Sequence, residues 1–136
     1  MIEPDALVGI VIVSHSASLA TGVAELAGAM AGPDVRIVAA GGGPDGSLGT
    51  DAGRIADAIR VANAGAGVVV VADLGSAVLA TRTALELLGA EPASHVRLSR
   101  GPIAEGAVLA AVQASAGMGL AEVLAAAEDA ARLPKD

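Results

Sequence analysis

Residues 7–16 have the sequence LVGIVIVSHS, in which a short apolar run ends abruptly in Ser-His-Ser. A continuous run of this kind, rich in β-branched residues, is typical of a parallel strand that is buried on both faces. Helix-like spacing begins at Ala17, so the strand is expected to deliver His15 to its carboxyl end, at the mouth of the following helix. Ligands bind at that edge of open α/β sheets, and we therefore interpret His15 as the central functional residue.

The rest of the chain alternates between strand-like and helix-like segments. Strands are predicted at about residues 7–13, 35–39, 68–72 and 95–98, and helices at about 17–30, 50–63, 77–88, 103–115 and 119–131. Such alternation predicts parallel strands joined by right-handed crossovers. The expected fold is therefore α/β: a single doubly wound domain over residues 1–136, with a mostly parallel four-stranded sheet and helices on both faces.

Apolar spacing also predicts which helix faces are buried. In the first helix, the positions i, i+4, i+7 and i+11 are Leu19, Val23, Leu26 and Met30. In the second helix, the expected apolar face consists of Ile55, Ala58, Ile59 and Ala62. Thr50 resembles the N-cap of this second helix, with Asp51 in the first turn. Residues 89–92 are expected to form a turn before the last strand.

The composition excludes several classes of function. The 136 residues carry a formal net charge of −7 and no cluster of basic residues, so nucleic acid and anionic membrane surfaces are unsuitable partners. The chain has no Phe, Trp, Tyr or Cys, which rules out base stacking on aromatic rings and thiol chemistry. The apolar runs are too short to span a bilayer, and the acidic residues 1–5 show no basic leader. A cytoplasmic protein is expected.

Two polar residues follow the two most apolar strands: His15 after the first and Asp73 after the third. If these strands are neighbours where the strand order reverses, both side chains face one crevice. A carboxylate that holds one ring nitrogen of a histidine leaves the other nitrogen as a nucleophile of fixed tautomer. Helix N-termini near Ser16 and Ser76 would supply backbone N–H groups for an anion. Together these features predict a site that carries a phosphoryl group on His15.

Each of these residues also has a simpler interpretation. His15 could be a loop histidine at the sheet edge, Asp73 a helix cap, and Ser76 either an N-cap or a donor to a phosphoryl oxygen. Arg100 follows the fourth strand and could meet a phosphoryl group, although a solvated arginine is the simpler expectation. His95 begins a strand, so it is expected at the opposite edge. No metal-ligand spacing is present, and no metal or cofactor is expected.

Two other kinds of site also occur at this edge of α/β sheets. The glycines at 41, 43 and 46 formally match a dinucleotide fingerprint, but residues 47–49 intervene before the helix, so a flexible loop is the preferred interpretation. Thr50 would then face the crevice. An aspartyl-phosphate receiver needs an acidic pair after the first strand and a lysine late in the sheet, whereas this chain has His15 and a single lysine, Lys135, in the tail.

Four segments of the sequence carry a resemblance to a known family. They are the start IVIVSHS, Gly49-Thr50-Asp51, the run from Asp73 to Ala77 (Asp-Leu-Gly-Ser-Ala), and residues 101–107. In this order they resemble the mannose-type enzyme IIA domains of the bacterial sugar phosphotransferase system. The branch that they resemble most is the phosphotransfer subunit of phosphoenolpyruvate-dependent dihydroxyacetone kinase. Mannose transport members carry a Trp-Gly-Gly-Ser-Pro run after the aspartate, which this chain lacks.

The resemblance implies a mechanism and a set of partners. His15 would accept a phosphoryl group from the phosphohistidine of HPr, on Nε2, with Asp73 oriented toward Nδ1; Ser16, Gly75, Ser76 and Thr50 would support the phosphoryl group. The group would pass to ADP in a nucleotide-binding kinase subunit, and then to dihydroxyacetone on a third subunit. A homodimer is implied. Enzyme IIA of a mannose-type transporter and a His-phosphorylated regulatory module remain alternatives.

Overall fold

A parallel four-stranded sheet forms the centre of the molecule in a computed structural model that describes residues 7–136. The strands are β1 (Gly9–Ser14), β2 (Ile37–Gly41), β3 (Val68–Ala72) and β4 (Val96–Leu98). Their order in the sheet is β2-β1-β3-β4, and all neighbours are parallel. The chain therefore moves from β1 outward to β2 and then returns across the sheet to β3. This reversal puts the switch point between β1 and β3, which fulfils the condition under which His15 and Asp73 are expected to face one crevice.

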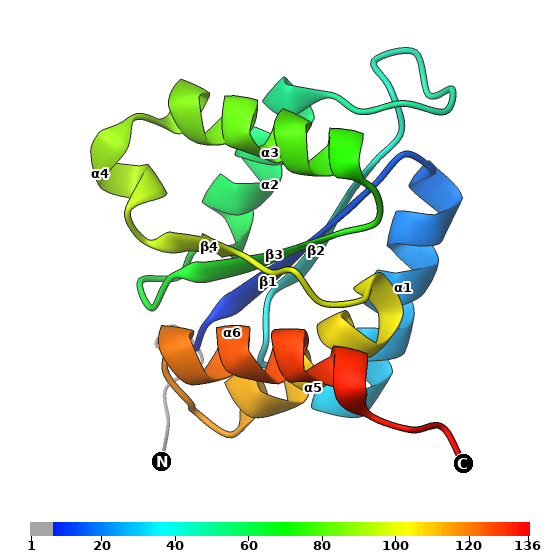
Figure 1. Cartoon of the computed structure of the whole chain (residues 1–136). Coiled ribbons are helices and arrows are strands. Elements are labelled where there is room, and N and C mark those ends of the chain that lie inside the picture. The colour runs from blue at the N-terminus through cyan, green and yellow to red at the C-terminus, as the bar shows by residue number, and fades with distance from the viewer. Residues whose placement is uncertain (1–6) are drawn as a thin grey trace.

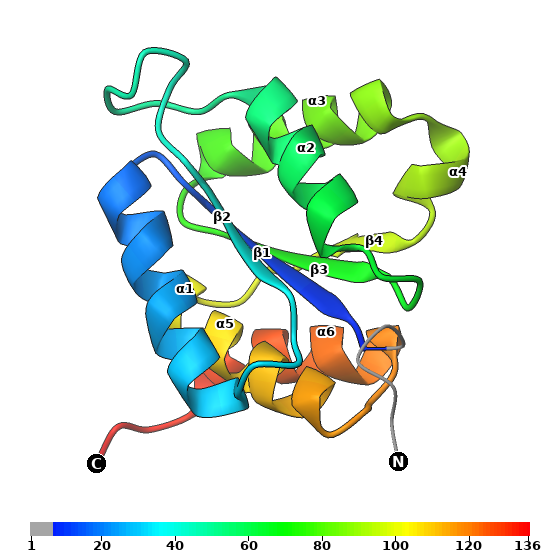
Figure 2. The same ribbon diagram turned by 180° about the vertical axis from the view of Figure 1, so that it is seen from behind.

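Helices cover both faces of the sheet, which confirms the predicted doubly wound α/β fold (Figures 1 and 2). One face carries α1 (Ala17–Ala31), α5 (Ile103–Ser115), α6 (Leu120–Asp129) and the short 3₁₀ helix η2 (Ala130–Arg132). The other face carries α2 (Ala52–Ala62) and α3 (Gly75–Leu88). A one-turn helix, α4 (Ala90–Ala93), stands where the sequence predicts only a turn, and it leads into β4.

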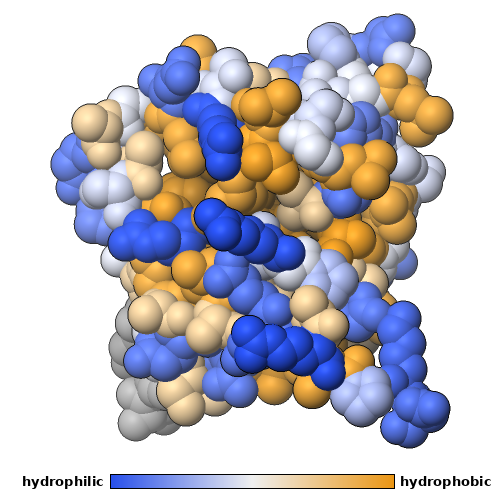
Figure 3. All heavy atoms as spheres, in the orientation of Figure 1, coloured by the Kyte–Doolittle hydropathy of each residue, from blue (hydrophilic) through white to orange (hydrophobic). Residues whose placement is uncertain are grey.

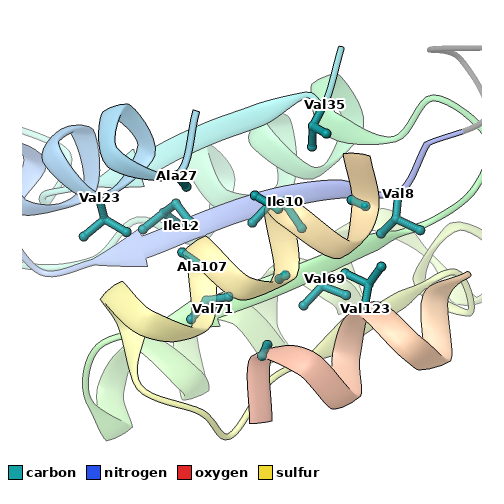
Figure 4. Close-up of a cluster of buried hydrophobic side chains, with 14 of the residues drawn as sticks. Val8, Ile10, Ile12, Val23, Ala27, Val35, Val69, Val71, Ala107 and Val123 are labelled. Carbon is teal, nitrogen blue, oxygen red and sulfur yellow. The ribbon is translucent and has the colours of Figure 1, made fainter. Parts of the chain in front are cut away.

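Hydrophobic side chains pack on both faces of the sheet, which explains why β1 has no polar residue before its last position. All six residues of β1 are buried. Successive strand residues point to opposite faces, so Ile10 and Ile12 pack toward α1 and α5 (Figure 4), whereas Val11 and Val13 pack toward α2 and α3. With both faces covered, both sets of side chains must be apolar.

The predicted buried face of α1 is wrong in most of its positions. Leu19, Leu26 and Met30 are 44%, 51% and 62% exposed, and only Val23 of the predicted set is buried. The buried side chains of this helix are Ala20, Val23 and Ala27. Small side chains let α1 lie close to the sheet and to the alanine-rich face of α5, so closeness of packing outweighs side-chain size. In α2, by contrast, Ile55, Ala58, Ile59 and Ala62 are all buried, as predicted.

The surface retains other large apolar side chains. Leu48, Leu74 and Leu79 are among those exposed, and the space-filling view shows apolar patches between charged groups on one face (Figure 3). Within residues 7–136, no helix combines the length and the hydropathy that crossing a membrane requires. The acidic start, residues 1–5, on which the prediction of no leader rests, lies outside the described residues.

Candidate functional site

His15 and Asp73 meet at the switch point, which confirms the predicted juxtaposition. Each residue follows the end of a strand, and β1 and β3 are hydrogen-bonded neighbours. The backbone N–H of Asp73 donates to the carbonyl of Val13 at 3.1 Å, so the two strand ends remain in register beyond the ladder. His15 Nδ1 then lies 2.9 Å from Asp73 Oδ1. The side chain of His15 is 25% exposed and that of Asp73 only 11%, so the imidazole faces solvent while the carboxylate lies beneath it.

Four hydrogen-bond donors surround the Asp73 carboxylate. Its Oδ2 accepts from the Ser14 hydroxyl at 2.9 Å and from the His15 backbone N–H at 3.0 Å. Its Oδ1 accepts from the His15 ring and from the Leu74 backbone N–H, the latter at 2.8 Å. Burial of the carboxyl raises its pKa, but the donors from His15, Ser14 and Leu74 outweigh that effect and lower the pKa of Asp73 below its ordinary value. Asp73 is therefore ionised at neutral pH.

The ionised carboxylate determines the tautomer of His15. Because Asp73 Oδ1 can only accept, Nδ1 of His15 carries the proton of the neutral ring, and the lone pair lies on Nε2. The Ser76 hydroxyl forms a hydrogen bond with that Nε2. An imidazole held in this way presents a nucleophilic nitrogen on the solvent side of the ring.

The first turn of α3 borders this nitrogen. The first helical hydrogen bond of α3 runs from the Ala77 N–H to the Leu74 carbonyl, so the N–H groups of Gly75 and Ser76 precede it and have no helical acceptor. Such N–H groups, together with the helix dipole, favour an anion. The arrangement places Nε2 of His15 beside a helix N-terminus that favours an anion.

Ser16, directly after His15, caps the helix that follows β1. Ser16 is the N-cap of α1, and its hydroxyl accepts from the Leu19 N–H at 3.1 Å. Its own backbone N–H donates to the Ser14 hydroxyl at 3.0 Å. The hydroxyl of Ser16 thus serves the helix, and its role in supporting a phosphoryl group stays a prediction, as does that of Gly75.

The glycine-rich loop between β2 and α2 is fastened beside the histidine. Gly49 N–H donates to the His15 carbonyl at 2.9 Å, and Gly42 N–H donates to the Ser14 carbonyl at 3.1 Å. From α2, Arg54 Nη1 donates to the carbonyl of Gly41 at 2.9 Å. Figures 1 and 2 both show this loop next to the start of α1. The loop is thus a neighbour of the site, held by hydrogen bonds at both ends.

The prediction that Thr50 caps α2 is wrong. Asp51 is the N-cap, and its carboxylate accepts from the Arg54 N–H at 3.3 Å. A short acidic side chain satisfies a free N–H and complements the helix dipole at once, which explains the choice of the aspartate over the threonine. Thr50 is half-buried directly after the loop that contacts His15. Its contact with a phosphoryl group stays a prediction.

The remaining polar candidates lie apart from the pair. His95 precedes β4, where its carbonyl accepts from the Val68 N–H, so it lies at the amino-terminal edge of the sheet, as predicted. Its ring contacts Glu91 at 3.1 Å. Arg100 is exposed, and its backbone N–H donates to the Glu128 carboxylate at 3.0 Å. Across residues 7–136, no three or more His, Cys, Asp or Glu side chains gather in a group that could hold a metal.

Ser14 is the residue that the sequence interpretation missed. The sequence indicates only that Ser14 ends the first strand. In the structure, its side chain is fully buried and forms a hydrogen bond with Asp73. A polar residue at the end of an otherwise apolar strand, directly before a candidate catalytic histidine, is the signal that could have revealed it.

The fold and the site define a doubly wound α/β domain with a carboxylate-oriented histidine at its switch point. A family model, EIIA-man (PTS system fructose IIA component), matches residues 9–124, and the chain belongs to that family.

Similar proteins agree with this assignment. The chain is 41% identical over 107 residues to the "PEP-dependent dihydroxyacetone kinase 2, phosphoryl donor subunit DhaM" of Listeria innocua, covering 79% of this chain and 86% of that protein. It is also 41% identical to the corresponding DhaM subunit of Escherichia coli, covering 87% of this chain but only 26% of that longer protein. The crystal structure of EF1359, a protein of unknown function, matches with a TM-score of 0.81 at 35% identity and covers 90% of this chain and 94% of that one.

Proposed function

We propose that this chain is the phosphoryl donor subunit of a phosphoenolpyruvate-dependent dihydroxyacetone kinase. It accepts a phosphoryl group from phospho-HPr on Nε2 of His15 and passes it to ADP held in a nucleotide-binding subunit, whose ATP then serves a dihydroxyacetone-binding subunit. Two relatives that carry the donor-subunit name, each 41% identical to the chain, support the assignment. The observation that carries the chemistry is the His15–Asp73 contact of 2.9 Å with Nε2 directed toward Ser76.

The site geometry supports a direct transfer between two histidines. The lone pair of Nε2 attacks the phosphorus of the donor phosphohistidine, and the P–N bond of the donor breaks while the new one forms. The electron pair of the broken bond returns to the donor imidazole. His15 keeps its Nδ1 proton, and Asp73 stabilises the positive charge that the ring gains. Catalysis of this kind depends on positioning and on charge stabilisation.

The start of α3 accommodates the transferred group. On phosphorylation, the Ser76 hydroxyl loses its Nε2 partner and turns to a phosphoryl oxygen, where the N–H groups of Gly75 and Ser76 add two further donors. Onward transfer reverses the same contacts, because His15 leaves as a neutral ring with its proton still on Nδ1. We expect a homodimer, as the resemblance implies, and a location in the cytoplasm.

The proposal is tested by intact-mass spectrometry at neutral to alkaline pH, after incubation with phosphoenolpyruvate, enzyme I and HPr. We expect one added phosphate that is labile to acid and absent in His15→Ala. His95→Ala is the matched control, since that ring is exposed at the other edge of the sheet, where it forms a hydrogen bond with Glu91. It should take up phosphate like the parent chain.

A second arm of the experiment identifies the acceptor. Phosphorylated chain is mixed with an ADP-loaded nucleotide-binding kinase subunit, and ATP formation is followed. Loss of the phosphate from His15 with stoichiometric ATP supports the kinase assignment. Uptake of phosphate without transfer to ADP would refute the kinase assignment and favour a transporter enzyme IIA or a regulatory module. No uptake from several HPr proteins would refute the carrier role altogether.

A further inference from the structure

We propose that Ser14 is a positioning residue, which fixes the Asp73 carboxylate and through it holds the His15 imidazole with Nε2 free for the phosphoryl group. The inference deepens the proposed function and rests on it only for the transfer step. Ser14 is fully buried, so it touches neither the phosphoryl group nor a partner. Its hydroxyl forms hydrogen bonds with Asp73 and with the backbone N–H of Ser16, and of these two groups Asp73 is the one that contacts the His15 ring.

The hydroxyl proton of Ser14 has a single possible direction in this structure. Among residues 7–136, Ser14 Oγ has two hydrogen-bond partners: the Ser16 backbone N–H at 3.0 Å and Asp73 Oδ2 at 2.9 Å. A backbone N–H can only donate, so Oγ accepts from Ser16 and directs its own proton at the carboxylate. The start of α1 therefore orients the hydroxyl, and the hydroxyl in turn holds the carboxylate.

The effect on His15 follows from how Asp73 is held. Oδ2 accepts from Ser14 and from the His15 N–H, while Oδ1 accepts from Leu74 and from the His15 ring. Each carboxylate oxygen thus has two donors, which fixes the plane of the group and points Oδ1 at Nδ1. Without Ser14, Oδ2 keeps one donor, and the plane that aligns the imidazole is less constrained. His15 is the only titratable side chain hydrogen-bonded to this carboxylate among residues 7–136.

The chain contains a matched control for this serine. Ser99 directly follows β4 at the same edge of the sheet where Ser14 ends β1. It is 4% exposed and accepts the backbone N–H of Gly101, two residues later, at 2.9 Å. The Ser14–Ser16 contact has the same spacing along the chain and a similar distance, 3.0 Å. Ser99, however, contacts no carboxylate among the described residues. Ser99→Ala therefore removes a buried hydroxyl from the same kind of turn without affecting Asp73.

The experiment compares Ser14→Ala, Ser14→Cys and Ser99→Ala with the parent chain. Carbon-13 NMR follows the titration of Asp73, and rapid quenching with mass spectrometry gives the rate of phosphorylation by phospho-HPr. We expect the Asp73 pKa of Ser14→Ala to rise by about one unit, because a charge-assisted hydrogen bond is lost. We also expect kcat to fall about tenfold while KM for phospho-HPr is unchanged, because the residue lies out of reach of the donor.

The two remaining variants decide the interpretation. Ser14→Cys keeps a side chain of similar size with a weaker donor and should show a smaller change in the same direction; it carries the test if Ser14→Ala does not fold. Ser99→Ala should lower stability and leave both the Asp73 titration and the rate unchanged. Parent-like Asp73 titration in the Ser14 variants, or equal effects from Ser99→Ala, would overturn the inference. If the parent chain takes up no phosphate, the proposed function fails, whereas the Asp73 titration still tests Ser14.

Discussion

Replacing Asp73 by asparagine removes the charge of the site while keeping the shape of the side chain. An asparagine must place its NH₂ group at one of the two positions that now hold carboxylate oxygens. At the Oδ2 position the NH₂ meets the His15 backbone N–H, and at the Oδ1 position it meets the Leu74 backbone N–H. Neither backbone donor can turn away, so either orientation of the amide leaves one donor facing another.

An amide with its NH₂ at the Oδ1 position also changes the histidine. An NH₂ group opposite Nδ1 requires that nitrogen to accept, which moves the ring proton to Nε2 and removes the nucleophilic lone pair. An amide with its NH₂ at the Oδ2 position keeps the tautomer of His15 but lacks the negative charge that stabilises the developing imidazolium. A hydrogen bond to a charged group contributes about 1.5–3 kcal/mol, which corresponds to about a 10- to 100-fold loss in rate. We expect the phosphorylation rate of Asp73→Asn to fall by at least that factor.

The assay for this prediction is the rate of phosphate incorporation by rapid quenching, with nitrogen-15 NMR of the His15 ring to report its tautomer. Asp51→Asn is the matched control, since it removes an equal charge from the N-cap of α2 and asparagine caps helices equally well. It should leave the rate within about twofold of the parent chain. An Asp73→Asn protein that accepts phosphate at the parental rate would refute the argument that the carboxylate orients His15.

Three further predictions concern stability and the loop. Gly41→Ala should destabilise the fold in urea titration, because the added Cβ would lie 2.6 Å from a backbone carbonyl oxygen at the start of α1. The control is Gly28→Ala within α1, where the added Cβ meets open space and should stabilise the protein by up to about 1 kcal/mol. Arg54→Met should speed hydrogen exchange at the Gly49 N–H, because the guanidinium no longer holds the loop; unchanged exchange would contradict this role. The lowered pKa of Asp73 stabilises the folded state at pH values above the unfolded-state pKa of about 4. This contribution is lost as the pH falls through the lower folded-state pKa. Asp73→Asn should therefore make the free energy of unfolding depend less on pH in that acid range.

The sequence predicted the strands and the central pair of the site because both depend on simple patterns. A polar residue directly after a buried strand must lie at the carboxyl edge of the sheet. Reversal of strand order between β1 and β3 then brings His15 and Asp73 together, although they lie 58 positions apart. The prediction needed only the strand ends and the topology, and neither depends on the detail of side-chain packing.

The details that the sequence did not predict depend on distances that only the folded chain sets. Hydrophobicity favours Leu26 and Met30 as the buried face of α1, but the short distance between this helix and α5 admits only small side chains there. Likewise, Ser14 and Arg54 acquire their partners across the sheet edge and the loop, and spacing along the chain does not indicate those partners.

The hydrogen-bond donors around Asp73 predict how strongly different substitutions at the site lower the rate of phosphate incorporation. Two of the four donors are backbone N–H groups, from His15 and Leu74, and no side-chain substitution removes them. Loss of Ser14 therefore leaves the carboxylate in place but less constrained, whereas Asp73→Asn removes its negative charge and leaves one oxygen, which can accept from only two of the four donors. Phosphate incorporation should accordingly be abolished in His15→Ala, fall further in Asp73→Asn than in Ser14→Ala, and be unaffected in Ser99→Ala. A Ser14 variant slower than Asp73→Asn would contradict this order, because Ser14 would then act on transfer by a route other than the carboxylate.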